Sequence, residues 1–400
     1  MVSNALQQLI SKIRPTAATA ALMLVVVLVL GAGTSQSAQA QTFTVLYDFT
    51  GSPDGEYSYA AVVRDAAGNL YGTTYEGGAS GYGTVFKVDT SGTETVLHSF
   101  SAGTDGSYPF AGVIQDNAGN LYGTTYEGGS SGYGTVFKVD TSGTETILYT
   151  FAGGTTDGCN PAGGLLRDKA GNLYGTAGAC GASGVGAVFK LSKKGKETVL
   201  HSFAGGSSDG AYPAFTTLLM DKKGKLYGVT EDGGTGGVGT VYVLSPRGTV
   251  TLLHSFIGGT TDGCYPLGSP AMDKDGTLYG TAEGCGSGSL GIVWKVSKKG
   301  TETVLHNFAG GSSDGASPLA GVVLDTKGNL YGDTDAGGAS SFGTVYELNK
   351  KGTLTLLHSF AGSDGSYPFG GVIRTSKGNL YGTAGSGGTY SYGTVWQLTK

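Results

Sequence analysis

Positive charge and long apolar stretches are scarce in this sequence of 400 residues. Lysine and arginine together number 25, against 30 aspartates and glutamates. A chain with this negative balance repels phosphate groups, so the composition argues against nucleic acid and anionic lipid surfaces as partners. Beyond residue 33, no segment is long and apolar enough for a membrane-spanning helix.

The single long apolar run lies near the N-terminus. Lys12 and Arg14 precede the run, which covers residues 17–30, and Ser37-Ala38-Gln39-Ala40 follows it. A basic, an apolar and a small-residue region in this order predict a secretory signal over residues 1–40. A retained membrane anchor is the alternative, because the run approaches the length that spans a bilayer. We expect a secreted, periplasmic or cell-envelope protein whose mature chain, 41–400, carries 23 basic and 30 acidic residues.

Glycine is abundant, with 75 residues, and it recurs at fixed places beside Val, Leu, Phe and Tyr. The phrase Leu-Tyr-Gly marks seven copies of a repeat of 50 to 53 residues, with its tyrosine at Tyr71, Tyr122, Tyr174, Tyr227, Tyr279, Tyr331 and Tyr381. Such a regular period indicates a turn-rich all-β array rather than a disordered, low-complexity chain.

Each copy contains four short β-type runs, which in the second copy are residues 111–114, 121–124, 135–139 and 146–151. Turns of the type Asp-x-x-Gly join the first run to the second, as at Asp116–Gly119. Six copies carry proline where the first run begins, a place that suits an edge strand. We therefore predict a seven-bladed β-propeller with four antiparallel strands per blade and the first strand lining the channel.

The two ends of the repeat array are offset. The mature chain opens with an isolated fourth strand, Thr44–Phe49, and ends with a third strand, Thr394–Leu398. The N-terminal strand is thus expected to complete the last blade and close the ring, which removes exposed sheet edges. A linear β-solenoid is the alternative, but it would not need this offset. We expect one propeller domain over residues 41–400, and a monomer.

The repeat resembles the GloVer tandem-repeat family of exported bacterial proteins, whose copies read like Gly119-Asn120-Leu121-Tyr122-Gly123-Thr124-Thr125 followed by Gly134-Thr135-Val136-Phe137. The resemblance spans residues 42–400. It implies export and a propeller-like array, and it implies no established activity and no catalytic residue.

The four cysteines form two pairs with the same spacing of 21 residues, at Cys159 and Cys180 and at Cys264 and Cys285. In each pair one cysteine precedes the first strand and the other lies between the second and third strands. Those two loops emerge on the same face of a blade, so we predict one disulfide within each pair. A single four-cysteine zinc site is the alternative, but the pairs are two blades apart.

The five histidines share one position of the fourth strand, where the other two copies have Tyr47 and Tyr149; they are His98, His201, His254, His306 and His358. Because tyrosine replaces them freely, we interpret them as packing or edge polarity rather than catalytic or metal-binding groups. Their spread around the rim excludes a Ser-His-Asp or Cys-His constellation. The third-strand aromatics, such as Phe86 and Trp294, also share one position and predict an interblade core.

Charge is sorted by face. The loops between the fourth and first strands and between the second and third strands contain fifteen acidic residues and no lysine or arginine. We call the face that carries these loops the loop face, and we predict that it is strongly negative. Seven of the acids form one Asp-Gly per copy, namely Asp54, Asp105, Asp157, Asp209, Asp262, Asp314 and Asp364. They make either the turn into the first strand or a carboxylate ring for Ca²⁺ or a cationic ligand.

Positions that differ between copies are the better candidates for ligand binding, because the blade itself does not demand them. Acids and tyrosines at such positions of the loop face could stack and hydrogen-bond a glycan or hold a basic protein patch. Tyrosine before proline could instead pack the loop. The candidates are Tyr57, Tyr75, Glu76, Tyr108, Tyr126, Glu127, Tyr212, Glu231, Asp232, Tyr265, Glu283, Asp333, Asp335 and Tyr367.

Three functions are compatible with these patterns. The first is an exported binding module that holds a glycan, a cation or a partner protein on the loop face. The second is an extracellular enzyme of lyase or lactonase type at the channel mouth, for which only Glu231, Asp232, Glu283, Asp333 and Asp335 depart from the seven-fold pattern. The third is a passive envelope or matrix protein. We assign no catalytic residue and, Ca²⁺ aside, no cofactor.

Overall fold

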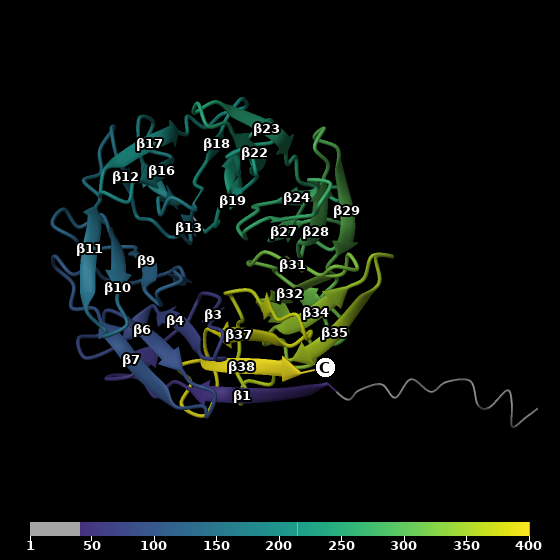
Figure 1. Ribbon diagram of the computed structural model, residues 1–400. Coiled ribbons are helices and arrows are strands. Elements are labelled where there is room, and N and C mark those ends of the chain that lie inside the picture. The colour runs from purple at the N-terminus through teal and green to yellow at the C-terminus, as the bar shows by residue number, and fades with distance from the viewer. Residues whose placement is uncertain (1–40, 214, 400) are drawn as a thin grey trace, which may run out of the picture. The chain divides into compact units, whose positions relative to one another are not determined.

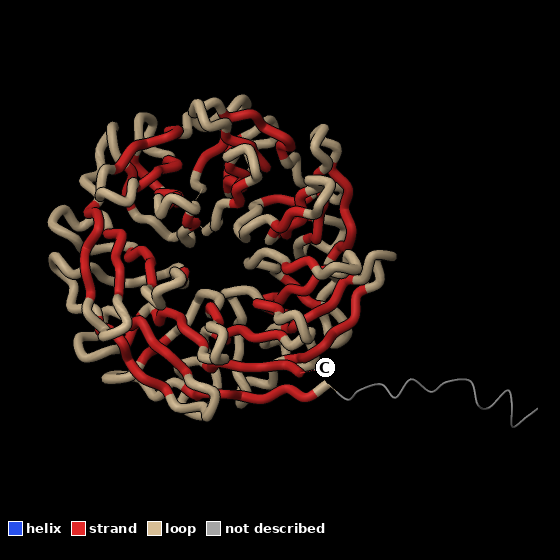
Figure 2. Tube along the Cα trace, viewed as in Figure 1, coloured by secondary structure: helices blue, strands red, loops and turns tan. Residues whose placement is uncertain are grey.

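The computed structural model describes residues 41–213 and 215–399. The predicted signal sequence, 1–40, lies outside the described residues. Residues Thr42–Thr399 form one compact unit, and the residues described within it form strands and loops without helices (Figure 2). No helix among them is long and apolar enough to cross a membrane.

Seven four-stranded antiparallel sheets follow one another around a ring (Figure 1), and their inner segments line a central channel. We number the blades in chain order and count strands from the channel outward. Blade 1 is β3 (Val63–Arg64), β4 (Leu70–Thr74), β6 (Thr84–Val88) and β7 (Glu94–Ser99); blade 2 is β8 (Ile114–Gln115), β9 (Leu121–Thr125), β10 (Thr135–Val139) and β11 (Glu145–Thr150); blade 3 is β13 (Leu166–Arg167), β14 (Leu173–Ala177), β16 (Ala187–Leu191) and β17 (Glu197–Ser202).

The remaining blades repeat this order. Blade 4 is β19 (Leu219–Met220), β20 (Leu226–Thr230), β22 (Thr240–Leu244) and β23 (Val250–Ser255); blade 5 is β25 (Ala271–Met272), β26 (Leu278–Ala282), β28 (Ile292–Val296) and β29 (Glu302–Asn307); blade 6 is β31 (Val323–Leu324), β32 (Leu330–Thr334), β34 (Thr344–Leu348) and β35 (Leu354–Ser359); blade 7 is β36 (Ile373–Arg374), β37 (Leu380–Ala384), β38 (Thr394–Thr399) and β1 (Thr42–Asp48).

The ring closes as the offset ends predict. Strand β1 pairs antiparallel with β38, and Phe43 lies opposite Leu398. In Figure 1 the purple β1 runs along the yellow β38 as the outermost strand of blade 7. The predicted fold, a seven-bladed propeller closed by its N-terminal strand, is confirmed.

The inner strands are shorter than the sequence suggests. In blade 2 the predicted strand 111–114 pairs only as β8 (Ile114–Gln115). The preceding residues line the channel instead, where backbones of adjacent blades approach closely: a Cβ on Gly112 would lie 2.5 Å from the carbonyl oxygen of Ala61. These residues therefore make contacts between blades instead of strand pairing within their own blade.

The core lies between blades, as the third-strand aromatics predict. Each is buried against a phenylalanine that follows the fourth strand of the preceding blade; Phe86 and Phe49, for example, have ring centroids 5.1 Å apart. The same ring explains the glycine of Leu-Tyr-Gly. A Cβ on Gly72 would lie 2.6 Å from the Phe86 ring, so only glycine leaves space for the aromatic side chain.

Short two-stranded ribbons tie the two kinds of loop together on the loop face. They are β2 (Gly55–Glu56) with β5 (Glu76–Gly77), β12 (Gly158–Cys159) with β15 (Ala179–Cys180), β18 (Gly210–Ala211) with β21 (Asp232–Gly233), β24 (Gly263–Cys264) with β27 (Gly284–Cys285), and β30 (Gly315–Ala316) with β33 (Ala336–Gly337). Isolated bridges, Ser107 to Glu127 and Ser366 to Ser386, replace the ribbon in blades 2 and 7.

Candidate functional site

In all seven blades, one residue of the loop between the second and third strands makes the same backbone hydrogen bond. Its backbone N–H donates to the carbonyl oxygen of the residue three places after the Asp-Gly aspartate, with N···O distances of 2.9–3.1 Å. We call this position the mouth row; in chain order it consists of Tyr75, Tyr126, Gly178, Glu231, Glu283, Asp335 and Gly385. The backbone is repeated, and the side chains are free to differ.

The mouth row divides into an acidic and an aromatic part. Three successive blades, 4 to 6, present Glu231, Glu283 and Asp335, whereas blades 1 and 2 present Tyr75 and Tyr126. Burial raises the pKa of all three carboxyl groups, that of Asp335 to about 6, and the charge of Glu283 raises the pKa of both neighbours further. Carboxylates that oppose one another's ionisation would be stabilised by a cation placed beside them.

Aromatic rings from the inner segments lie next to the mouth row and were missed by the sequence analysis. Tyr59 packs against Tyr75 at 5.6 Å between ring centroids, and Phe110 contacts both Tyr59 and Phe215 at 5.4 and 4.9 Å. Phe369 completes the group, which lines a channel cavity of 300 Å³. The sequence does contain a signal for this group, since the residue after the proline position is aromatic at Tyr59, Phe110 and Phe369, and Phe215 lies one place further along the chain.

Five tyrosines that lie three residues after the Asp-Gly aspartate, four of them directly before proline, have a strained backbone. Tyr57, Tyr108, Tyr212, Tyr265 and Tyr367 all have φ between 55° and 59°. Left-handed backbone costs a residue with a side chain about 1–2 kcal/mol, and a residue before proline normally adopts an extended conformation. Three of these side chains, Tyr212, Tyr265 and Tyr367, are 39–42% exposed. A strained loop therefore presents aromatic side chains to solvent, a combination that is typical of binding surfaces.

The Asp-Gly aspartates point to the outer strand rather than into the channel. Asp209 accepts from the backbone N–H of Ala204 and Gly210, and its Oδ2 lies 3.0 Å from His201 Nε2. All five histidines make this contact, and in the other two copies the Tyr47 and Tyr149 hydroxyls donate to Asp54 and Asp157. Histidine and tyrosine are interchangeable because each can donate a hydrogen bond to this aspartate.

The remaining candidates are scattered. Glu76 and Asp232 are partly buried on the ribbons, and Glu127 is exposed beside its bridge to Ser107. Asp333 lies not in a loop but in β32, only 1% exposed, and neither of its carboxyl oxygens has a hydrogen-bond partner of acceptable geometry.

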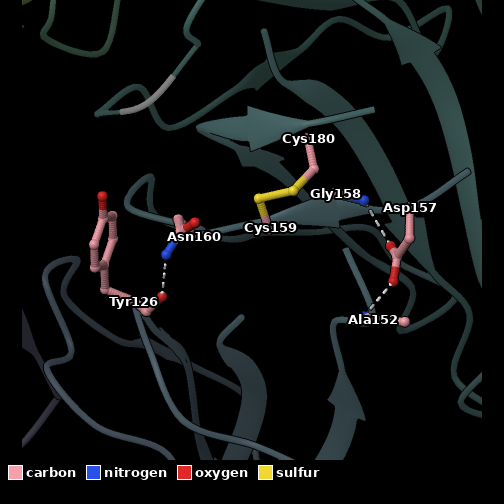
Figure 3. Close-up of a disulfide and its surroundings, with 7 residues drawn as sticks. All are labelled: Tyr126, Ala152, Asp157, Gly158, Cys159, Asn160 and Cys180. Atoms are coloured by element: carbon pink, nitrogen blue, oxygen red, sulfur yellow. Dashed lines mark hydrogen bonds between the residues drawn. A yellow bond between two sulfur atoms is a disulfide. The ribbon is translucent and has the colours of Figure 1, made fainter. Parts of the chain in front are cut away.

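Both predicted disulfides are present, and each pins one ribbon. Cys159 bonds Cys180 across β12 and β15, and Cys264 bonds Cys285 across β24 and β27. Figure 3 shows the first disulfide between Asp157, which binds the amides of Gly158 and Ala152, and Asn160, whose side-chain amide donates to the Tyr126 carbonyl oxygen. The disulfides therefore rigidify the loop face in blades 3 and 5.

Four outer strands begin with a glutamate. Each of these glutamates faces the Asp-Gly aspartate of the loop that follows the outer strand of the preceding blade. Burial, and then the charge of that aspartate, raises the pKa of Glu94, Glu145, Glu197 and Glu302 to about 7. Since these carboxyls hold a proton more tightly in the folded chain, their contribution to stability is complete below pH 4.5 and is lost as pH rises to 7.

We therefore expect Glu197→Gln to raise the free energy of unfolding by about 1 kcal/mol at pH 8 and to leave it almost unchanged at pH 4. The expected gain is small because the side chain is half exposed and water screens its charge. Urea unfolding at both pH values measures this. The exposed Asp275→Asn, on the opposite face, serves as the control. Equal effects of Glu197→Gln at both pH values would contradict the prediction.

Comparison with solved structures gives matches at low identity, of which the second described here, with the higher TM-score, has the same fold. The chain is similar to a gluconolactonase from Xanthomonas campestris, with 15% identity, a TM-score of 0.43, and coverage of 92% of this chain and 93% of that one. It is also similar to the extracellular domain of a putative one-component system from B. thetaiotaomicron, with 12% identity and a TM-score of 0.55. That match covers 87% of this chain, which spans 39% of the other.

Sequence comparison identifies the repeat itself. No curated protein matches the chain. The model of the Gloeobacter/Verrucomicrobia repeat matches residues 31–218 and again residues 215–400, and so spans the whole propeller. The chain belongs to the Gloeobacter/Verrucomicrobia repeat family.

Proposed function

We propose that this protein is an exported binding module that holds an amine-bearing glycan at the channel mouth of the loop face. The observation that carries the proposal is the division of the mouth row. At one structurally equivalent position, Glu231, Glu283 and Asp335 form an acidic side, and Tyr75 and Tyr126 form an aromatic side. Glycines at the two remaining positions leave space between the two sides.

An amino sugar fits both sides. Its ammonium group would lie against the carboxylates, whose raised pKa values favour a neighbouring cation, and its C–H face would stack on tyrosine. Compact metal binding fits this place less well, since among the described residues no three of these carboxylates bring their oxygens within 4.8 Å of one another. The enzymatic alternative at the channel mouth stays a prediction.

The test compares glucosamine oligosaccharides with their fully N-acetylated counterparts by isothermal titration calorimetry. Residues 41–400, which contain every strand and core cluster that the structure describes, are the protein to use. We expect binding of the free-amine oligosaccharide only, weakened about tenfold or more by Glu283→Gln, since a charge-assisted contact is worth about 1.5–3 kcal/mol. Tyr126→Ala should weaken it similarly, and Asp275→Asn should not.

Equal binding of the acetylated oligosaccharide would contradict the proposal that the carboxylates bind the ammonium group of the glycan. Absence of binding by both, on a broad glycan array as well as by calorimetry, would overturn the glycan proposal and favour a protein partner or a passive scaffold.

A further inference from the structure

At the outer rim, three different metal-ligating side chains meet where blades 1 and 2 join. His98 belongs to β7, Asp105 to the loop that follows, and Glu145 is the first residue of β11. One ligand atom of each lies within 4.8 Å of the other two. His98 Nε2 and Asp105 Oδ1 are 3.0 Å apart. Within the part of the chain that the structure describes, no other group of His, Cys, Asp or Glu is this compact.

One carboxyl oxygen of the third member, Glu145, has no hydrogen-bond partner. Oε1 of Glu145 is buried and makes no hydrogen bond, although it faces a second carboxylate. A buried carboxylate oxygen costs free energy unless it is paired, and here the Asp105 carboxylate, which has the same sign of charge, lies within 4.8 Å. The arrangement therefore leaves a place for a cation between Glu145 and Asp105.

The two other side chains are already held in position. Asp105 Oδ2 accepts from the backbone N–H and the hydroxyl of Ser101, at 2.6 and 2.9 Å, which leaves Oδ1 turned toward His98. The His98 ring packs edge-on against Phe100, with centroids 4.8 Å apart. Outer contacts that fix the orientation of ligands in this way are a regular feature of metal sites.

The other blades show which side chains the site needs. Two blades lack the histidine: Glu94 and Glu197 each face an aspartate that binds a tyrosine hydroxyl instead. Three other blades lack the glutamate, and its position is taken by Val250, Leu354 or Phe43. In blade 7, Phe43 stacks on His358 at 3.6 Å instead. The complete set of three recurs only as His254, Asp262 and Glu302, where the closest His–Asp distance is 3.4 Å.

We propose that His98, Asp105 and Glu145 bind a divalent transition-metal ion of the Zn²⁺ class. One imidazole nitrogen and two carboxylate oxygens form a mixed donor set that suits Zn²⁺, with water as the fourth ligand, better than the all-oxygen sets that Ca²⁺ or Mg²⁺ prefer. The ion would join the outer strands of blades 1 and 2. This site lies on the rim, so it does not depend on the ligand at the channel mouth.

The experiment is a Zn²⁺ titration by calorimetry on residues 41–400 carrying Glu302→Gln, which disables the related group in blade 5. We expect one equivalent of Zn²⁺, and at least tenfold weaker binding with Glu145→Gln or with His98→Tyr. Tyrosine occupies the histidine position in two blades, so His98→Tyr is compatible with the fold. Co²⁺ should give visible absorption bands that His98→Tyr abolishes.

The repeat supplies both a matched control and a gain of function. His201→Tyr should leave binding unchanged, because Val250 stands there in place of the glutamate, whereas Val250→Glu should add a second equivalent. Absence of Zn²⁺ binding, or binding that Glu145→Gln and His98→Tyr leave intact, would overturn the proposal.

Discussion

Replacing Asp333 with threonine is expected to raise the free energy of unfolding at neutral pH by about 3 kcal/mol, the upper range for relieving one unsatisfied buried polar group. Asp333 is 1% exposed in β32, and neither carboxyl oxygen has an acceptable hydrogen-bond partner. Burial raises the pKa of this carboxyl well above its ordinary value, and the nearby Gly371 amide only partly opposes the shift.

The repeat explains why threonine should fit. In blades 1, 5 and 7 the equivalent residue is a threonine whose hydroxyl donates to a carbonyl oxygen on the inner segment of the next blade, as from Thr73 to Ala111 at 3.0 Å and from Thr383 to Ala60 at 3.0 Å. Gly370 holds the corresponding place beside Asp333. Threonine would replace an unpaired carboxyl by a satisfied hydroxyl.

The gain should depend on pH. A carboxyl whose pKa is raised by folding leaves stability intact below its unfolded pKa of 3.8 and lowers it progressively as pH increases. The difference between Asp333→Thr and the parent protein, measured by urea unfolding, should therefore grow from pH 4 to pH 9.

Thr281→Asp is the matched reverse variant, because Thr281 donates to the Ala320 carbonyl oxygen at 2.6 Å in blade 5. It should lose stability with the same pH dependence. A stability loss on Asp333→Thr would contradict the prediction and indicate that Asp333 has a bound partner in solution.

The repeat makes the fold predictable because one environment recurs seven times. Gly72 shows why. An aromatic ring of the third strand lies where its side chain would be, so the glycine of Leu-Tyr-Gly is required by a contact between the second and third strands. The offset ends predicted the pairing of β1 with β38 for the same reason, since an incomplete blade exposes hydrogen-bonding groups that the other end can satisfy.

Side-chain contacts between strands and loops were harder to predict from the sequence. A bulge between the third and fourth strands of every blade, as between Val85 and Phe86 in blade 1, shifts the side-chain alternation by one residue. The sequence therefore did not show which side His98 faces, and its contact with Asp105 was missed. Tyr108 is a similar case, because local rules predict an extended residue before Pro109 and hydrogen bonds across the loop face hold it left-handed.

The acidic side of the mouth row was visible in the sequence as residues that break the repeat, namely Glu231, Glu283 and Asp335. Asp333 was grouped with them because it was assigned, together with Asp335, to the loop between the second and third strands. Strand β32 ends at Thr334, so Asp333 lies on the strand and is buried, whereas Asp335 lies in the bend that follows and is partly exposed. Depth within a blade depends on the adjacent blade, which the sequence spacing does not describe.

Removal of both disulfides is expected to have the largest effect on stability, about 6 kcal/mol, because the chain-entropy relation gives about 3 kcal/mol for each loop of this size. Each bond joins cysteines 21 residues apart, so each restricts the unfolded chain to the same extent. Unfolding in guanidinium with and without reductant measures the total.

Variants that copy another blade separate the bond from the packing. Ribbon β18–β21 has Ala211 and Gly233 at the two cysteine positions. Cys180 has φ 62°, where glycine is easily accommodated, so Cys159→Ala with Cys180→Gly reproduces a pair that the fold already contains. This double variant should lose about 3 kcal/mol, and reductant should then remove only the contribution of Cys264–Cys285. Equal stability of the variant and the parent would show that the unfolded chain is restricted by the β-hairpins themselves rather than by the bond.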